Sequence, residues 1–295
     1  MKLRVAPLAL AASFLPLAAP AQTPTRIGTI IVAHGGSAEW NGHVKEVAGL
    51  VKTGGPVAVS FLMGPEAATT RFQDVATTME RSGVASIVVV PMLVSSYSEH
   101  YEQVRYLAGA TDSINHALHA LMGHSGLEPV KVSVPMKISR AIDDSPVAAQ
   151  ILAERALALT TAPAKRALFL VGHGPNTAED YAHWMENLRT IVDSVRTRAP
   201  FADVRVDLVR DDAPKHVRAE AVRRVRELID LQHRLTGDSV VVVPVLLSRG
   251  RVSRETFMAD LSGLPVIYSG DPLLPHRGLA RWVEQRVQEA SAAHH

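Results

Sequence analysis

The chain has 295 residues, no cysteine and a formal net charge of +2 at pH 7. The lack of cysteine excludes a disulfide framework, a thiolate metal site and a thiol nucleophile. A hydrophobic content of 47% excludes intrinsic disorder and is enough for a sizeable core in one large or two small domains.

Residues 1–21 have the pattern of a secretory signal peptide. Lys2 and Arg4 precede the apolar stretch Val5–Leu17, and a run of small residues follows as a cleavage site. The stretch is too short for a good membrane span, so we expect no stable membrane insertion after cleavage. We therefore expect a mature chain that begins near Gln22 and is periplasmic or secreted. Its basic and acidic residues would then balance at 29 each, which gives a nucleic-acid partner no general electrostatic support.

The first half alternates apolar runs with segments of helical spacing. This alternation predicts a parallel sheet built from right-handed crossovers. A Ser-Pro pair after two aspartates marks the start of the last helix of this half. The expected strands are Ile27–Val32, Val57–Leu62, Ser86–Leu93 and, more weakly, Val130–Val134, and the expected helices lie around 44–50, 72–79 and 146–159.

The second half repeats this order. Val-Val-Val-Pro-Met-Leu around Pro91 matches Val-Val-Val-Pro-Val-Leu around Pro244. We therefore expect an α/β fold of two similar lobes, 22–162 and 163–295, each a small parallel sheet flanked by helices, with a cleft between the lobes. The expected strands are Ala167–Val171, Val204–Val209, Ser239–Leu247 and Pro265–Tyr268, and the expected helices are Tyr181–Val195, Lys215–Leu235 and Arg277–Glu289.

A histidine and a glycine follow the first strand of each half, at His34 and His173. Ligands of open α/β sheets bind beyond the carboxyl ends of the strands, where an imidazole can act as a metal ligand or as an acid or base. The alternative is a histidine that only holds a neighbouring loop, but recurrence in both halves favours function. Trp40 and Trp184 follow the two histidines and either stack on a ligand or anchor the loops.

His100 follows the third expected strand, so its loop should open on the same edge of the sheet as His34. Two imidazoles and the carboxylate of Glu99 would suit a borderline divalent cation such as cobalt, nickel, iron or zinc. The alternative is that Ser98 caps a helix and that Glu99 and His100 are solvated residues of its first turn.

The order of these motifs resembles that of the class II tetrapyrrole chelatases, and specifically the sirohydrochlorin cobaltochelatase group in its two-copy form. The resemblance implies a lyase-type, ATP-independent insertion of a divalent metal, cobalt or alternatively nickel or iron, into an anionic sirohydrochlorin-type tetrapyrrole. It implies that His34 and His100 are the metal ligands. Because metal insertion needs a base for the two pyrrole protons, an imidazole or Glu99 is the candidate acceptor. Pro275-His276 is similar to a Pro-His pair in the family. No nucleotide is expected, since the chain has no P-loop motif.

The second half departs from this pattern, because no histidine there matches His100. We therefore infer one complete metal site, in the first half, and expect loss of His173 to affect metal binding much less than loss of either ligand. Arginine offers a planar fork for carboxylates, so the cluster after Pro244 is a candidate for binding the tetrapyrrole, the alternative being solvated arginines that balance nearby acids. The three arginines are Arg249, Arg251 and Arg254.

Two further interpretations concern the first lobe and the class of protein. The loop Ser95–Glu99 stands where the family often has Gly-Gly-His. His116 and His119 share a helical face and form either a metal entry path or part of an exposed insertion. A periplasmic metal- or tetrapyrrole-binding protein without turnover is the chief alternative to an enzyme. A hydrolase that uses His34 as a base is disfavoured because no Gly-x-Ser-x-Gly motif occurs.

Overall fold

The computed structural model describes residues 26–292, apart from the side chains of residues 117 and 121. The expected signal peptide, residues 1–21, lies outside the described residues. Within that described part, no helix is both long and apolar enough to cross a membrane.

The first sheet is parallel with the strand order β2-β1-β3-β4. Its strands carry β-branched residues that alternate between two faces: Ile31 and Ala33 face one core, whereas Ile30 and Val32 face another. The strands are β1 (Ile27–Ala33), β2 (Val57–Phe61), β3 (Ser86–Met92) and β4 (Met136–Ile138), with helices α1 (Ala38–Leu50), α2 (Phe72–Arg81), α3 (Glu99–Leu107) and α4 (His116–Ser125).

The second sheet has the same order, β6-β5-β7-β8, and is also parallel. The registers coincide as well, because Pro91 lies opposite Val32 and Pro244 lies opposite Val171. The predicted two-copy α/β fold is therefore confirmed. The elements are β5 (Ala167–Gly172), β6 (Asp203–Leu208), β7 (Val240–Val245), β8 (Val266–Tyr268), α6 (Ala178–Arg196), α7 (Lys215–Thr236) and α8 (Phe257–Asp260), with a 3₁₀ turn at Pro163–Lys165 and a π turn at Val252–Thr256.

The strand predicted at Val130–Val134 is wrong. The backbone N–H groups of Ser133 and Val134 donate to the Glu80 carboxylate, at 2.6 and 3.2 Å, instead of to a neighbouring strand. Pairing with β3 begins only after Pro135, whose carbonyl accepts from Ile87, and β4 is the short strand that follows. The valines of the predicted strand pack on the core as irregular chain.

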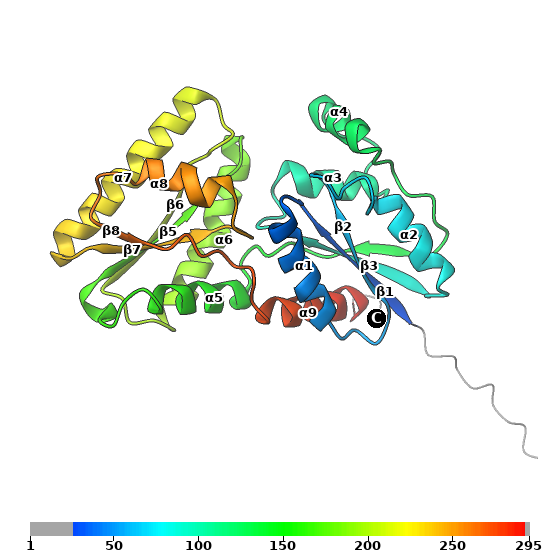
Figure 1. Ribbon diagram of the computed structural model, residues 1–295, viewed down its shortest axis with the longest axis horizontal. Helices are drawn as coiled ribbons and strands as arrows, with labels where there is room; N and C mark the ends of the chain where they lie inside the picture. The colour runs from blue at the N-terminus through cyan, green and yellow to red at the C-terminus, as the bar shows by residue number, and fades with distance from the viewer. Residues whose placement is uncertain (1–25, 293–295) are drawn as a thin grey trace, which may run out of the picture.

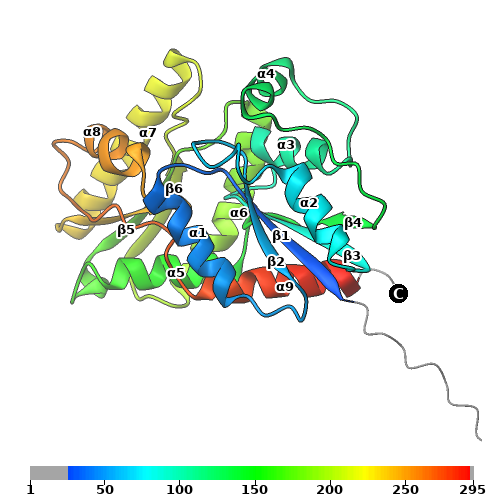
Figure 2. The ribbon, with the colours of Figure 1, turned by 45° about the vertical axis from the view of Figure 1, so that its right-hand side comes forward.

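Two helices pack across the boundary between the sequence halves. The helix α5 (Pro146–Leu157) packs on α6 and β7 of the second half, and α9 (Gly278–Ala292) packs on α1 and β3 of the first. Figures 1 and 2 show α5 beneath the second sheet and α9 beside α1. One continuous hydrophobic core, with residues of both sheets and of α1, α5, α6 and α9, results from this exchange. The lobe boundary at 162/163 stays a prediction from the sequence. In the folded chain, each half supplies one helix that packs on the sheet of the other half.

Candidate active site

The loop after β1 fixes the position of His34. Gly35 has φ +87°, and a Cβ atom there would lie 2.2 Å from the carbonyl oxygen of Met63, so glycine is required. The Met63 N–H donates to the His34 carbonyl at 2.8 Å. The Nδ1 of His34 lies 2.7 Å from the Gly35 carbonyl, which can only accept, so Nδ1 carries the proton. The Nε2 lone pair is therefore free for a ligand.

His100 lies in the first turn of α3, close to His34. Ser98 caps this helix by accepting from the Tyr101 N–H, as the alternative interpretation required, but His100 is half-buried and not solvated. Its Nδ1 lies 3.1 Å from Oε1 of the buried Gln103, which leaves its Nε2 free. The ring centroids of His34 and His100 are 4.6 Å apart with an angle of 84° between the planes. The two imidazoles that the sequence singled out are thus neighbours.

The environment keeps His100 neutral at physiological pH. Burial is the main cause that lowers its pKa to about 4, and the positive charge that His34 would carry lowers it further. Neutral imidazole is the form that binds a metal ion. His100 is therefore ready for coordination without first losing a proton.

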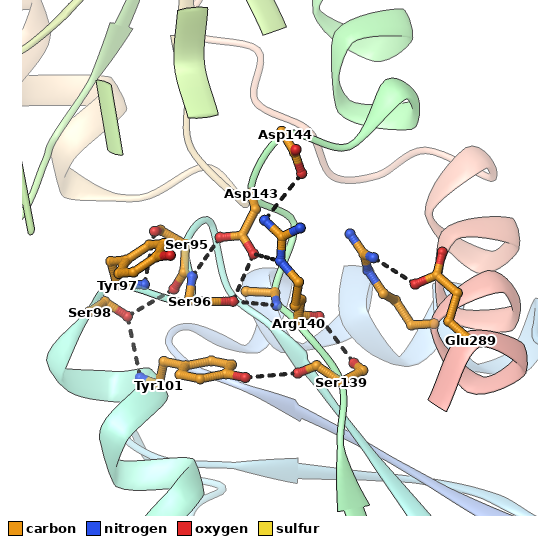
Figure 3. Close-up of polar contacts among 12 residues, drawn as sticks. Ser95, Ser96, Tyr97, Ser98, Tyr101, Ser139, Arg140, Asp143, Asp144 and Glu289 are labelled. Atoms are coloured by element: carbon orange, nitrogen blue, oxygen red, sulfur yellow. Dashed lines mark hydrogen bonds and ion pairs between the residues drawn. The ribbon is translucent and has the colours of Figure 1, made fainter. Parts of the chain in front are cut away.

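A buried carboxylate supports the loop that leads into α3 (Figure 3). Asp143 accepts from the N–H and the hydroxyl of Ser96, both at 2.7 Å, and from Nε of Arg140 at 3.2 Å. Its side chain is fully buried, and its φ of +47° is one of two positive values among the non-glycine residues that the structure describes. Ser145, and not Asp143, caps α5. Asp143 thus joins the loop after β4 to the loop that precedes His100 and α3.

The second lobe also holds this loop. The Tyr97 ring stacks on His183 with centroids 4.2 Å apart, and the Trp184 indole N–H donates to the Tyr97 carbonyl at 2.6 Å. Trp184 therefore anchors a loop of the other lobe, and it also lines the cavity described below, so its stacking on a ligand stays a prediction. Trp40 lies 6.5 Å from His34 between ring centroids and lines the cavity described next.

His173 repeats the arrangement of His34 in detail. Its Nδ1 lies 2.8 Å from the carbonyl of Gly174, which has φ +79°. The Asp211 N–H donates to the His173 carbonyl at 3.0 Å. Burial lowers the pKa of His173 as well. His34, His100 and His173 all line one cavity of about 360 Å³, a size within the range of small-molecule sites. The sequence interpretation had set His173 apart from the metal site, whereas the structure brings it to the same cavity.

The other candidate residues are distributed unevenly around this cavity. Glu99 is exposed and lines it, and so does Arg251, which is paired with Asp211 at 3.4 Å. Arg249 is paired with Asp271, and Arg254 with Glu39 of the first lobe at 2.8 Å, and neither lines the cavity. All three arginines therefore balance nearby acids, and only one of them faces the candidate site.

The remaining histidines singled out in the sequence lie elsewhere. His276, two residues before α9, contacts Glu154 at 3.0 Å. His116 and His119 lie on α4, outside the cavity lining. Between residues 26 and 292, no three histidine, aspartate or glutamate side chains are arranged to hold one metal ion. The structure therefore offers two adjacent imidazoles and a third from the other lobe.

Comparison with known proteins starts from the first lobe. Residues 28–159, nearly the whole lobe, match the family model named CbiX. The first lobe is therefore similar in sequence to the CbiX family. No curated protein sequence matches the chain.

Solved structures extend the similarity from the first lobe to the whole chain. SirB from Bacillus subtilis with Fe3+ is 15% identical with a TM-score of 0.59, over 90% of this chain and 96% of that one. The sirohydrochlorin chelatase SirB from Bacillus subtilis subspecies spizizenii in complex with cobalt is 16% identical with a TM-score of 0.57, over 91% and 97%. CbiX, described as the terminal enzyme for biosynthesis of siroheme in denitrifying bacteria, is 13% identical with a TM-score of 0.53, over 90% and 99%. The chain therefore has the class II chelatase fold that its motifs resembled.

Sequence reasoning missed two features of this site. Asp143 was visible only as part of a helix-start pattern, which carries no signal that its carboxylate turns back to Ser96. The shared cavity of His34 and His173 follows from the spatial relation of the lobes, which a repeat in the sequence does not specify. The repeated His-Gly pair was nevertheless a signal that both positions have the same local geometry.

Proposed function

We propose that the protein inserts a divalent metal ion into a tetrapyrrole without ATP. The observation that carries this proposal is the pair of adjacent imidazoles, His34 and His100, each with Nδ1 engaged and Nε2 free, in a cavity at the carboxyl edge of the first sheet. Metal insertion requires a cation that is held firmly enough to be positioned but has open coordination positions, and two protein ligands leave such positions. The CbiX match and the chelatase fold support this function.

The proposed substrates are a sirohydrochlorin-type macrocycle and cobalt, with nickel or iron as alternatives. Imidazole nitrogen suits all three metals, so the ligand set favours this group over magnesium or calcium without selecting within it. The similar SirB structures contain Fe3+ in one case and cobalt in the other. In this proposal Arg251 contacts a carboxylate of the macrocycle and Glu99, at the exposed side of the cavity, takes up a released proton.

The test is the absorbance change of sirohydrochlorin mixed with cobalt and the purified mature chain. We expect the protein to accelerate metal insertion over the protein-free rate, and His34→Ala and His100→Ala each to abolish most of the acceleration. His216→Ala is the matched control, because His216 is exposed at the start of α7 and does not line the cavity. Equal rates for the control and for both site variants would contradict the assignment of the two ligands.

A carrier without turnover is the second candidate. The loop that leads to His100 is tied to the second lobe through Tyr97 and Trp184, an arrangement that favours retention of a ligand. Tight binding of cobalt or of sirohydrochlorin with no acceleration of insertion would support this candidate. Export through the expected signal peptide belongs to the same proposal, since a periplasmic protein would meet its metal outside the cytoplasm.

A further inference from the structure

We propose that His173, from the second lobe, is the base that removes a pyrrole proton from the macrocycle while His34 and His100 of the first lobe hold the metal ion. This inference rests on the proposed function. It assigns to the second copy of the His-Gly loop a catalytic role in a site whose metal ligands lie in the first copy.

The first step of the argument is the protonation state of His173. Its Nδ1–H donates to the Gly174 carbonyl, so Nε2 carries the free lone pair that a base needs. The loop requires glycine after His173, because Gly174 has a positive φ and a Cβ there would lie 2.9 Å from Cβ of Leu208. The ring of Trp184 packs against His173 with a centroid separation of 5.5 Å. His173 is thus held as a neutral acceptor.

The second step is the division of the imidazoles between the lobes. His34 and His100 are neighbours on the first sheet, whereas His173 reaches the same cavity from the second. His173 is near enough to His100 for a positive charge on His173 to lower the pKa of His100. Among the described residues, however, these three histidines are not spaced as ligands of one metal ion. A macrocycle bound in this cavity would contact His173 as well as the metal ion held by the pair. His173 is therefore placed as a base and not as a third ligand.

The third step is where the proton goes. When one pyrrole N–H bond breaks, its electron pair stays on the pyrrole nitrogen and forms the bond to the metal, while the proton forms a new N–H bond at Nε2 of His173. The second pyrrole proton goes to Glu99 in the proposed function, and the oxidation state of the metal does not change. The carboxylates of Asp211 and Asp212 lie in the adjoining loop and favour the positively charged imidazolium. Because Asp212 is exposed, the proton can pass from His173 to solvent through this side.

The experiment compares His173→Gln with wild type and with His216→Gln, all in the mature chain. Glutamine keeps the polar size of histidine but cannot take up a proton. We expect kcat for cobalt insertion into sirohydrochlorin to fall about 100-fold or more, as for loss of a general base. The Kd for cobalt alone, measured calorimetrically, should stay within about twofold, because a base does not contribute to metal affinity as a ligand does. Thermal unfolding verifies the fold, and His173→Asn serves as a second variant if His173→Gln does not fold.

Three results would overturn the inference. An insertion rate of His173→Gln within about threefold of wild type would show that no proton transfer depends on it. A loss of cobalt affinity as large as that of His34→Gln would make His173 a ligand instead. A wild-type protein that binds cobalt through His34 and His100 but does not accelerate insertion would contradict the proposed function, and with it the role of His173. The insertion rate of the wild type is therefore measured before any His173 variant, which distinguishes this outcome from the other two.

Discussion

Replacement of Asp143 by asparagine tests whether the buried carboxylate holds the loop that leads to His100. The carboxylate accepts two short hydrogen bonds from Ser96 and a longer one from Arg140. The amide oxygen of the introduced asparagine can keep the bond from the Ser96 N–H, but its amide nitrogen would face the Ser96 hydroxyl, which already accepts from Ala141. The hydroxyl proton and Nε of Arg140 then lose their acceptor.

The magnitude follows from these contacts. A hydrogen bond to a charged group is worth about 1.5–3 kcal/mol, and the Arg140 contact counts for little because that side chain is 53% exposed. We expect Asp143→Asn to lower the free energy of unfolding by about 3 kcal/mol, which for a chain of this size corresponds to a fall of roughly 6 °C in Tm. Cobalt affinity should fall as well, because the loop before α3 positions His100.

Calorimetry of thermal unfolding and of cobalt binding checks both effects. Asp144→Asn is the matched control, since Asp144 contacts the same arginine at 3.3 Å but its side chain is 38% exposed. We expect it to change stability by less than about 0.5 kcal/mol. A variant of Asp143 with the stability and cobalt affinity of the control would refute the positioning role.

Four further predictions concern single positions. The pKa of His100 is about 4 in the folded chain and near 6.5 in the unfolded chain. Its contribution to the free energy of unfolding, up to about 3 kcal/mol, is therefore present above pH 6.5 and is lost as the pH falls towards 4. In urea unfolding, the free energy of unfolding of His100→Gln should change less over this pH interval than that of the wild type. Gly35→Ala should lower the free energy of unfolding by at least about 2 kcal/mol and weaken cobalt binding. Gly42→Ala, where a Cβ meets nothing within 4 Å, should leave both the stability and the cobalt affinity undiminished in the same assays. Arg254→Ala should change the free energy of unfolding by less than about 1 kcal/mol, because its bridge across the lobes is about half exposed; a larger loss on thermal unfolding would give that bridge a structural role. Expression in a bacterial host with its export machinery should yield a mature chain that begins after Ala21, and N-terminal sequencing that finds residue 1 intact would remove the predicted signal peptide.

Much of the fold could be predicted from the sequence because hydrophobic periodicity reports directly on strands and helices. The prolines of β3 and β7 identified the duplication, and the structure gives them equivalent registers. The strand expected at Val130–Val134 failed because a side chain, Glu80, captures the backbone N–H groups that a strand would use. The exchange of α5 and α9 between the sheets could not be predicted, because it depends on which sheet each amphipathic helix covers and not on its own pattern.

The candidate site shows the same division between local and spatial information. The proximity of His34 and His100 followed from the rule that parallel strands end at one edge, and the structure places their rings together. The arginines were a weaker prediction, because the sequence does not show that each one is paired with an acid. The position of His173 required the relative placement of two sheets, which only the folded chain provides.

X-ray absorption of cobalt bound to the mature protein is the most direct test of the central claim that His34 and His100 together hold the metal ion. We predict two imidazole ligands per cobalt in the wild type, with oxygen ligands completing the coordination. We also predict a loss of imidazole scattering in both His34→Gln and His100→Gln. A cobalt ion surrounded by oxygen alone, or an unchanged spectrum in either variant, would contradict that claim.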